Sequence, residues 1–179
     1  MESLHNNDIE LKNLEMKNAS EIFRLTDKNR AYLKKTLPWL DGTTKVEDTE
    51  KFITDSLQKQ SEGKQAIFEI WYQNVLVGLV DFHEISESRK SALIGYWLDE
   101  EYQGKGVMTE ATKLLVKYGF DTLGLNRIEI NCSTENPKSG VVAKRLGFTK
   151  EGVSRQAALL YGKFEDLEVW SLLRSEFTY

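Results

Sequence analysis

The stretch Gln103-Gly104-Lys105-Gly106-Val107-Met108-Thr109 joins a run that alternates like a β-strand, ending near Leu98, to a run with helical periodicity. Its two glycines let the backbone turn so that several N–H groups point inward. A loop that runs into a helix N-terminus in this way concentrates partial positive charge, and Lys105 adds a full charge. The stretch therefore predicts a strand–loop–helix unit that can hold a pyrophosphate group.

The pattern outside this loop predicts the element order βααβββαβαββ. Apolar alternation and β-branched runs predict strands at Ile9 and Leu11, Ala66–Tyr72, Val75–Phe82, Ala92–Leu98, Arg127–Ser133, Phe148–Val153 and Leu167–Leu172. Helical spacing predicts helices that follow Asn18, Thr44, Gly106 and Asn136. We expect the Asn18 and Asn136 side chains and a Thr44–Glu47 capping box to cap three of these helices. This order belongs to a mixed α/β structure, expected to form a single domain over residues 1–179.

Composition excludes several classes of protein. The 179 residues include 24 basic and 28 acidic side chains, and a net charge of −4 disfavours nucleic acid or an anionic membrane surface as the main partner. The longest apolar run, 75–80, is far shorter than the ~20 residues of a membrane span. With the single cysteine Cys132 and no signal-like N-terminus, we expect a cytoplasmic protein without a disulfide.

Other phosphate and metal motifs do not fit the sequence. A dinucleotide-binding motif starting at Gly104 needs a third glycine where Thr109 stands, and a P-loop needs glycine where Asp99 stands. With two histidines and no paired cysteines, we expect no metal site. His83 is expected to end a strand near the surface.

The segment Gln103–Met108 resembles the acyl-coenzyme A loop of the GNAT N-acetyltransferase superfamily, although Met108 replaces the glycine or alanine usual at the last position. The resemblance covers nearly the whole chain. It continues in Leu37–Leu40, Ile94–Leu98, Thr109–Ala111, Leu125–Glu129, Asn136 with Ser139, Leu146–Phe148, Glu151 with Gly152, and Asp166. Together these residues are similar to the RimJ/RimL-type branch, the ribosomal-protein N-terminal acetyltransferases.

The resemblance implies a GNAT-like α/β fold: a twisted, mostly antiparallel sheet of about seven strands with helices on both faces. Two central strands, 92–98 and 127–133, would splay apart and hold acetyl-coenzyme A between them. An amine would attack the thioester directly, without an acyl-cysteine intermediate. Backbone N–H groups around Trp97 and Leu98 would polarise the thioester oxygen as an oxyanion hole does.

The resemblance also assigns residues to the site. The expected donor-binding residues are Trp97, Leu98, Gln103, Gly104, Lys105, Gly106, Val107, Met108, Thr109, Asn136 and Ser139. Asn136 would contact the pantetheine arm, and Ser139 would donate a hydrogen bond or proton to the departing thiolate. The alternative is structural: Asn136 caps a helix and Ser139 is an ordinary first-turn residue. Trp39 is the expected acceptor contact.

No general base can be assigned. Ala158 stands where ribosomal-protein members carry a catalytic glutamate, and Leu93 stands where many relatives have a strand glutamate. Asp81, Glu84 and Asp166 are candidates by location only. Deprotonating a lysine or polyamine amine at neutral pH costs about 3.4 kcal/mol more than deprotonating an α-amine, because their pKa values are about 10.4 and about 7.9.

This difference favours the N-terminal amine of a protein, with ribosomal proteins as the first candidates. The alternatives are a small amine, such as an antibiotic or polyamine, and an acyl-coenzyme A-binding module without turnover. The resemblance leaves a homodimer open.

Overall fold

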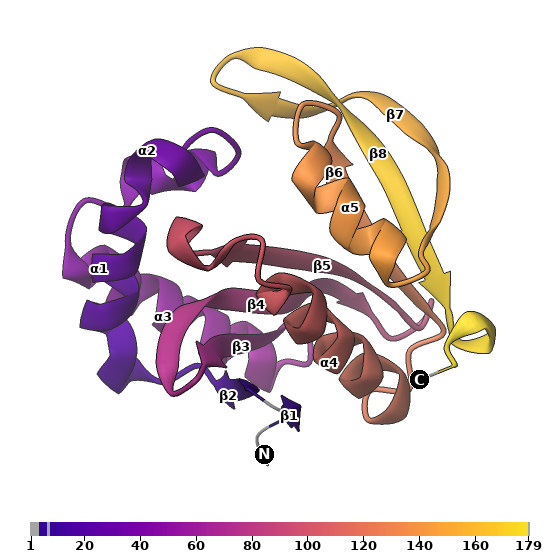
Figure 1. Ribbon diagram of the computed structural model, residues 1–179, viewed down its shortest axis with the longest axis horizontal. Coiled ribbons are helices and arrows are strands. Elements are labelled where there is room, and N and C mark those ends of the chain that lie inside the picture. Colours follow the sequence, from indigo (N-terminus) through magenta and orange to yellow (C-terminus); the bar gives the residue numbers. More distant parts are fainter. Residues whose placement is uncertain (1–3, 7, 179) are drawn as a thin grey trace.

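The computed structural model describes residues 4–6 and 8–178 (Figure 1). The strands are β1 (Leu4–Asn6), β2 (Ile9–Asn13), β3 (Ala66–Tyr72), β4 (Val75–Ser86), β5 (Ser91–Leu98), β6 (Arg127–Ser133), β7 (Thr149–Leu160) and β8 (Lys163–Leu173). The α-helices are α1 (Ala19–Lys28), α2 (Arg30–Leu33), α3 (Val46–Ser61), α4 (Val107–Asp121) and α5 (Pro137–Arg145). Short 3₁₀ turns lie at Met16–Asn18, Pro38–Gly42, Glu100–Tyr102 and Arg174–Glu176. In this part of the chain, no helix has the length and apolar character that a membrane span requires.

The eight strands form one sheet in the order β1-β2-β3-β4-β5-β6-β8-β7. All neighbouring pairs are antiparallel except β5 and β6, which are parallel. The parallel pairing joins Ser91–Leu93 to Arg127–Glu129 and stops there, although β5 continues to Leu98 and β6 to Ser133. Beyond this point the two strands diverge (Figure 1). The expected splayed pair is therefore confirmed, and the sheet has one strand more than the sequence predicts.

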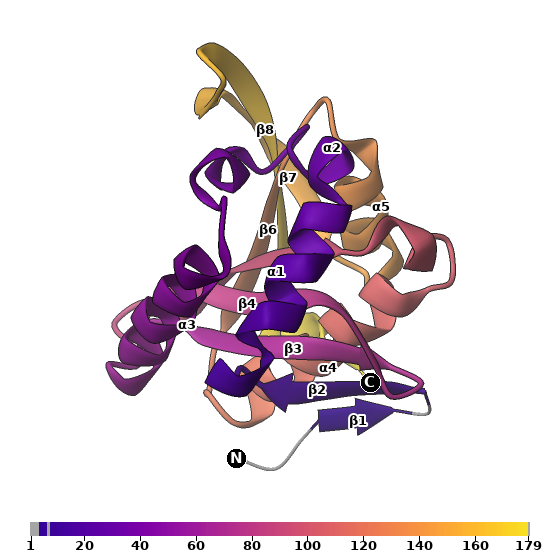
Figure 2. The same ribbon diagram turned by 90° about the vertical axis from the view of Figure 1, so that its left-hand side faces the viewer.

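Helices cover both faces of the sheet, with α1 and α3 on one face, the α3 face, and α4 and α5 on the other, the α4 face (Figure 2). Each face has its own core. On the α4 face, Phe68, Phe82 and Ile128 are buried together with residues of α4. On the α3 face, Ile53 and Trp97 belong to the second core. Burial of each large side chain stabilises the fold by roughly 1.5–3 kcal/mol.

Alternation along β5 decides which side chains reach each face. Ile94 and Tyr96 pack with the core of the α4 face, whereas Trp97 packs with the core of the α3 face. Gly95 lies between them and faces the same side as Trp97. Strand β5, which borders the divergence, therefore has different side chains on the two faces of the sheet.

The expected helix caps are wrong in detail. The Asn18 side chain does not cap α1; its Nδ2 donates to both carboxylate oxygens of Glu69, at 3.0 and 2.8 Å. Glu69 is fully buried, and a buried carboxylate needs such donors, so the Asn18 amide stabilises the fold more in this place than as a helix cap. The capping box is one residue later than expected, because Asp48 accepts hydrogen bonds from the N–H groups of Thr44 and Lys45. Asn136 precedes α5 without a side-chain cap.

The last two strands are longer than the sequence predicts. β7 and β8 extend to a tight turn at Tyr161 and Gly162, both with positive φ. The added halves expose large side chains such as Leu159 and Phe164, so they lack the alternation of buried residues from which a strand is recognised. The resulting hairpin extends beyond the rest of the sheet on the β6 side of the divergence (Figure 1).

Candidate active site

The glycine loop at the start of α4 has the geometry that the sequence predicts for it. Gly104 and Gly106 have φ of 73° and 79°, the left-handed region that glycine adopts without strain. Gly106 is the N-cap, and the first hydrogen bond of the helix joins the Glu110 N–H to its carbonyl. The N–H groups of the first three helical residues therefore have no preceding carbonyl within the helix. They form a row of donors at the positive end of the helix dipole.

Two flanking helices hold this loop. The Gln103 side chain donates to the Tyr32 hydroxyl on α2 and accepts a hydrogen bond from Lys138 Nζ on α5, at 2.8 Å. Lys105 Nζ lies 4.7 Å from the centroid of the Tyr102 ring. Val107 and Met108 are buried in the core, so only their backbone can meet a ligand.

Backbone direction along β5 follows from the hydrogen bonds at its two ends. The Lys90 carbonyl accepts from Arg127 N–H at 3.1 Å, so it points toward β6, whereas Asp99 N–H donates to the Val77 carbonyl in β4 at 2.8 Å. Because alternate residues of a strand direct their backbone groups to opposite neighbours, Tyr96 and Leu98 face the β6 side, whereas Trp97, which was expected to contribute an N–H, faces β4. Their N–H groups open into the space from which β6 has diverged.

Three side chains from β5, β6 and α5 meet on the α4 face of this space. The Tyr96 hydroxyl lies 2.7 Å from Ser139 Oγ, and the Cys132 thiol on β6 lies close to Ser139. Burial raises the pKa of Tyr96 to about 12 and also raises the pKa of the Cys132 thiol. All three groups therefore stay neutral at physiological pH and can act as hydrogen-bond donors.

A pocket of about 330 Å³ lies on the α3 face, between α1, α3, the Pro38–Gly42 turn and the sheet. Its lining residues are all uncharged: Ile22, Thr26, Trp39, Thr43, Thr49, Phe52, Leu79 and Trp97. Trp39 is 46% exposed at this pocket, and Trp97 is the residue between Tyr96 and Leu98 on β5. The pocket thus lies directly behind the strand that borders the divergence.

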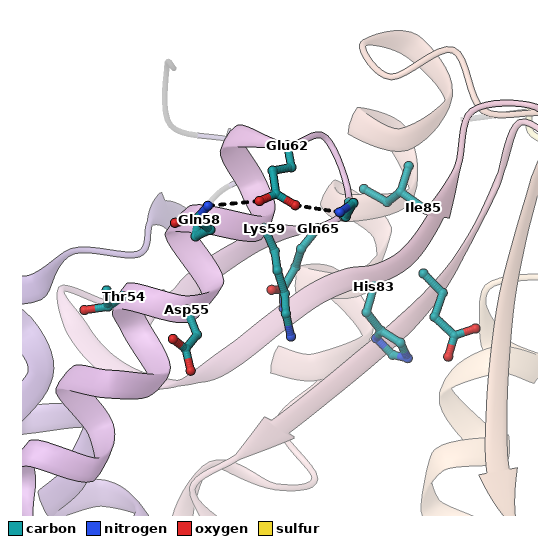
Figure 3. A pocket seen from close by; sticks show the side chains of 10 residues that line it. Thr54, Asp55, Gln58, Lys59, Glu62, Gln65, His83 and Ile85 are labelled. Carbon is teal, nitrogen blue, oxygen red and sulfur yellow. Dashed lines mark hydrogen bonds and ion pairs between the residues drawn. The ribbon is translucent and has the colours of Figure 1, made fainter.

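A second, more polar pocket of about 710 Å³ lies on the same face, between the C-terminal half of α3 and the end of β4 (Figure 3). His83 lines it, and its Nδ1 lies 3.3 Å from Asp81 Oδ2. His83 was expected to end its strand, but β4 continues for three more residues, to Ser86. The imidazole is therefore held at the sheet surface and not on a loose loop.

A carboxylate that the sequence pattern did not predict lies directly across the hairpin from Ala158. Ala158 in β7 pairs with Glu165 in β8, and Glu165 Oε2 accepts a hydrogen bond from Ser133 Oγ at 2.5 Å. The register of this hairpin shifts between Ser154 and Ala158, so it cannot be read from alternation. Asp166, a candidate by location, accepts from the Gln156 N–H at 2.8 Å within the hairpin.

The comparisons with known proteins agree with this geometry. A family model described as an acetyltransferase (GNAT) domain matches residues 8–149. The chain belongs to the GNAT acetyltransferase family. This GNAT acetyltransferase is 31% identical to the ribosomal-protein-serine acetyltransferase of Escherichia coli (strain K12), over 91% of each chain.

Two solved structures are similar to this GNAT acetyltransferase along nearly its whole length. RimL, a ribosomal L7/L12 α-N-protein acetyltransferase solved with coenzyme A, has a TM-score of 0.93 at 30% identity and covers 98% of this chain and 99% of its own. The microcin C7 self-immunity acetyltransferase MccE, solved with acetyl-coenzyme A and AMP, has a TM-score of 0.90 at 34% identity, with coverage of 94% and 93%. Both neighbours bind their coenzyme A ligand on the fold described above, which confirms the expected family and fold.

Proposed function

We propose that this enzyme transfers the acetyl group of acetyl-coenzyme A to the N-terminal amine of a protein, with ribosomal proteins as the first candidates. The observation that carries the proposal is the divergence of β5 from β6. One row of unpaired N–H groups, one hydroxyl pair and one uncharged pocket all adjoin it. The cytoplasm, where ribosomal proteins are made, is the corresponding location.

The donor would bind along the divergence. The pyrophosphate would accept hydrogen bonds from the loop 103–106 and the first turn of α4, with Lys105 and Lys138 supplying positive charge. The pantetheine arm would lie between β5 and β6 beside Asn136. The thioester sulfur would then lie near Ser139, and the carbonyl oxygen near the N–H of Leu98.

The chemistry needs a neutral amine. Its nitrogen attacks the thioester carbon, the C–N bond forms, and the oxygen becomes an anion that the Tyr96 and Leu98 N–H groups stabilise. When the C–S bond breaks, the electron pair stays on sulfur. Since a thiol has a pKa of about 8.5, a hydrogen bond from Ser139 stabilises the thiolate without complete proton transfer. Tyr96 supplies the second hydroxyl of that network.

The pocket lined by Trp39 and Trp97 supports an uncharged first side chain on the acceptor. A polyamine carries a second ammonium, which would lose hydration in this pocket without a carboxylate to replace it. The names of the relatives agree, because a ribosomal-protein-serine acetyltransferase and RimL are both similar along most of the chain. A protein N-terminus with a small or apolar first residue is therefore the favoured acceptor.

A second candidate is an amine-bearing antibiotic. The similarity to the microcin C7 self-immunity acetyltransferase at 34% identity favours it, and the aromatic pocket could also hold a small ring system. A third hypothesis is that the chain binds acyl-coenzyme A without turnover. It predicts binding of acetyl-coenzyme A but no thiol release.

Thiol release from acetyl-coenzyme A tests the proposal. The assay would use a pool of short peptides with varied first residues and the same pool blocked at its N-termini. Release that disappears on blocking is the expected result. Equal release from both pools would indicate acetylation of side-chain amines. If neither pool gives release, the assay is repeated with free small amines as acceptors.

A further inference from the structure

Gly95 marks a place where two side chains of β4 lie against β5 on the α3 face. A Cβ added at Gly95 would lie 2.7 Å from Asp81 Oδ1 and 3.1 Å from His83 Cε1. The carboxylate and the imidazole therefore occupy the space that any other residue at position 95 would fill. Gly95 directly precedes Tyr96 in β5, so the His83 ring lies against the strand that borders the divergence, on its α3 face.

The imidazole is also oriented by a chain of hydrogen bonds. The Gln65 amide donates to Asp81 Oδ2 at 3.1 Å, and the same oxygen lies 3.3 Å from His83 Nδ1. In the neutral ring, Nδ1 carries the proton and donates it to Asp81. Nε2 is then the unprotonated, basic nitrogen. The His83 side chain is 40% exposed and the Asp81 side chain 17%, so the ring can meet a ligand while its partner stays fixed.

We propose that His83 is the general base of the reaction, removing the proton from the acceptor ammonium, and that Asp81 positions it. The inference rests on the proposed acetyl transfer and supplies the base which that reaction lacks. His83 pairs with Leu93 across the β4–β5 ladder. Leu93 is apolar and stands where many relatives have a glutamate. His83, directly opposite it in β4, supplies a titratable group at the same level of the sheet.

The proton balance is simple. The ammonium loses one proton to His83 Nε2 and becomes the neutral amine that attacks. The imidazolium is stabilised by Asp81 and releases its proton to water through the open 710 Å³ pocket. After the attack, the amine nitrogen loses its second proton as the C–S bond breaks, and the thiolate takes up one proton, so coenzyme A leaves as the thiol and no other co-reactant is needed.

Charged groups of both signs surround the ring. On β4 they are Asp81 and Glu84, and across the pocket they are Asp55, Lys59, Glu62 and Lys64. Figure 3 shows Lys59, Gln65 and His83 among the side chains that line this pocket. The hydrogen bond with Asp81 raises the pKa of His83 above 6.5, burial opposes this, and the charges of Asp81 and Glu84 add to the rise. A raised pKa makes the imidazole a stronger base toward the acceptor ammonium.

The test compares kcat/KM as a function of pH for wild type, His83→Gln, Asp81→Asn and a control. Asp55→Asn is the control because Asp55 lines the same pocket from α3 but pairs with Lys51. We expect His83→Gln to lower kcat/KM roughly 100-fold near pH 7, a typical general-base contribution, with an unchanged KM for acetyl-coenzyme A. The decrease in kcat/KM should become smaller at a pH above the pKa of the peptide amine, because the amine is already neutral there and needs no base.

The Asp81→Asn variant tests whether Asp81 acts by positioning His83 or only by stabilising the fold. Removing its charge lowers the pKa of His83, so the acidic limb of the profile should move to lower pH while the protein stays folded. A His83→Gln loss that is the same at every pH, or no loss, would overturn the proposal. The proposal would also be overturned if the fall in kcat/KM at low pH disappears in Glu165→Gln but persists in His83→Gln.

The proposed function can fail separately from this inference. If wild type releases no thiol with peptides, the same variants are measured with a free small amine as acceptor. The His83 ring can also be titrated by NMR without turnover, because His5 is the only other histidine. A His83 pKa that does not fall in Asp81→Asn would contradict the proposed pairing.

Discussion

The hydroxyl groups of Tyr96 and Ser139 lie 2.7 Å apart and join the end of β5 to the first turns of α5. In the proposed complex, the thioester sulfur would lie beside this hydrogen bond. Replacing Ser139 with alanine removes the donor to the thiolate, and a hydrogen bond to a charged group contributes about 2 kcal/mol. We therefore expect Ser139→Ala to lower kcat roughly 30-fold with little change in the acetyl-coenzyme A Kd.

Tyr96→Phe is the companion variant, because it leaves Ser139 in place but removes its partner. A smaller loss in kcat is expected. Steady-state kinetics together with a calorimetric Kd measure both variants. Equal losses in turnover and affinity for Ser139→Ala would assign Ser139 to binding alone.

The glycine loop makes a second prediction about affinity. Gly106→Val places a β-branched residue at φ 79°, which costs roughly 1–2 kcal/mol and turns the N–H groups of the loop away from a phosphate. We expect the Kd for acetyl-coenzyme A to rise about tenfold or more. Gly124→Val is the matched control, because Gly124 has φ 64°, equally open surroundings and a position beyond the other end of α4. If both variants weaken binding alike, the loop is not the phosphate site.

Direct attack by the amine makes a third prediction. Cys132 lies beside Ser139, but burial raises the pKa of its thiol, so little thiolate exists at pH 7. Cys132→Ala should keep turnover within a few-fold of wild type, as measured by thiol release. Loss of all turnover, or an acetyl group found on Cys132 by mass spectrometry, would require a covalent intermediate.

Glu69 makes a prediction about stability. This fully buried carboxylate accepts hydrogen bonds from Asn18 Nδ2, the Glu15 N–H and the Trp71 indole. Glu69→Ala leaves these donors without a partner and opens a cavity, so the free energy of unfolding should fall by about 2–4 kcal/mol. Denaturant unfolding measures it. A change below about 0.5 kcal/mol would mean that water replaces the carboxylate at no cost.

Much of the site could be predicted from local sequence. Strands β3 and β6 have the predicted bounds, because runs of β-branched and aromatic residues end at clear turns such as Gln73-Asn74. Gly104 and Gly106 adopt the positive φ that the glycine loop implies. These features depend on neighbours in sequence, and patterns over a few residues therefore determine them.

The rest depends on residues that meet only in the folded protein. Nothing near Asn18 in sequence shows that Glu69 will need its amide, and the pairing of Ala158 with Glu165 depends on an irregular hairpin. The contact of Asp81 and His83 with Gly95 comes from the register of β4 against β5. The short β1 carries no pattern by which a strand could be recognised.

The most direct measurement is to locate the acetyl group on a product peptide. A peptide with a free N-terminus and an internal lysine is incubated with the enzyme and acetyl-coenzyme A near pH 7, and fragmentation mass spectrometry locates the modification. Acetyl transfer to a protein N-terminus predicts a single acetyl group on the α-amine. Acetylation of the lysine side chain, with the α-amine left free, would contradict it.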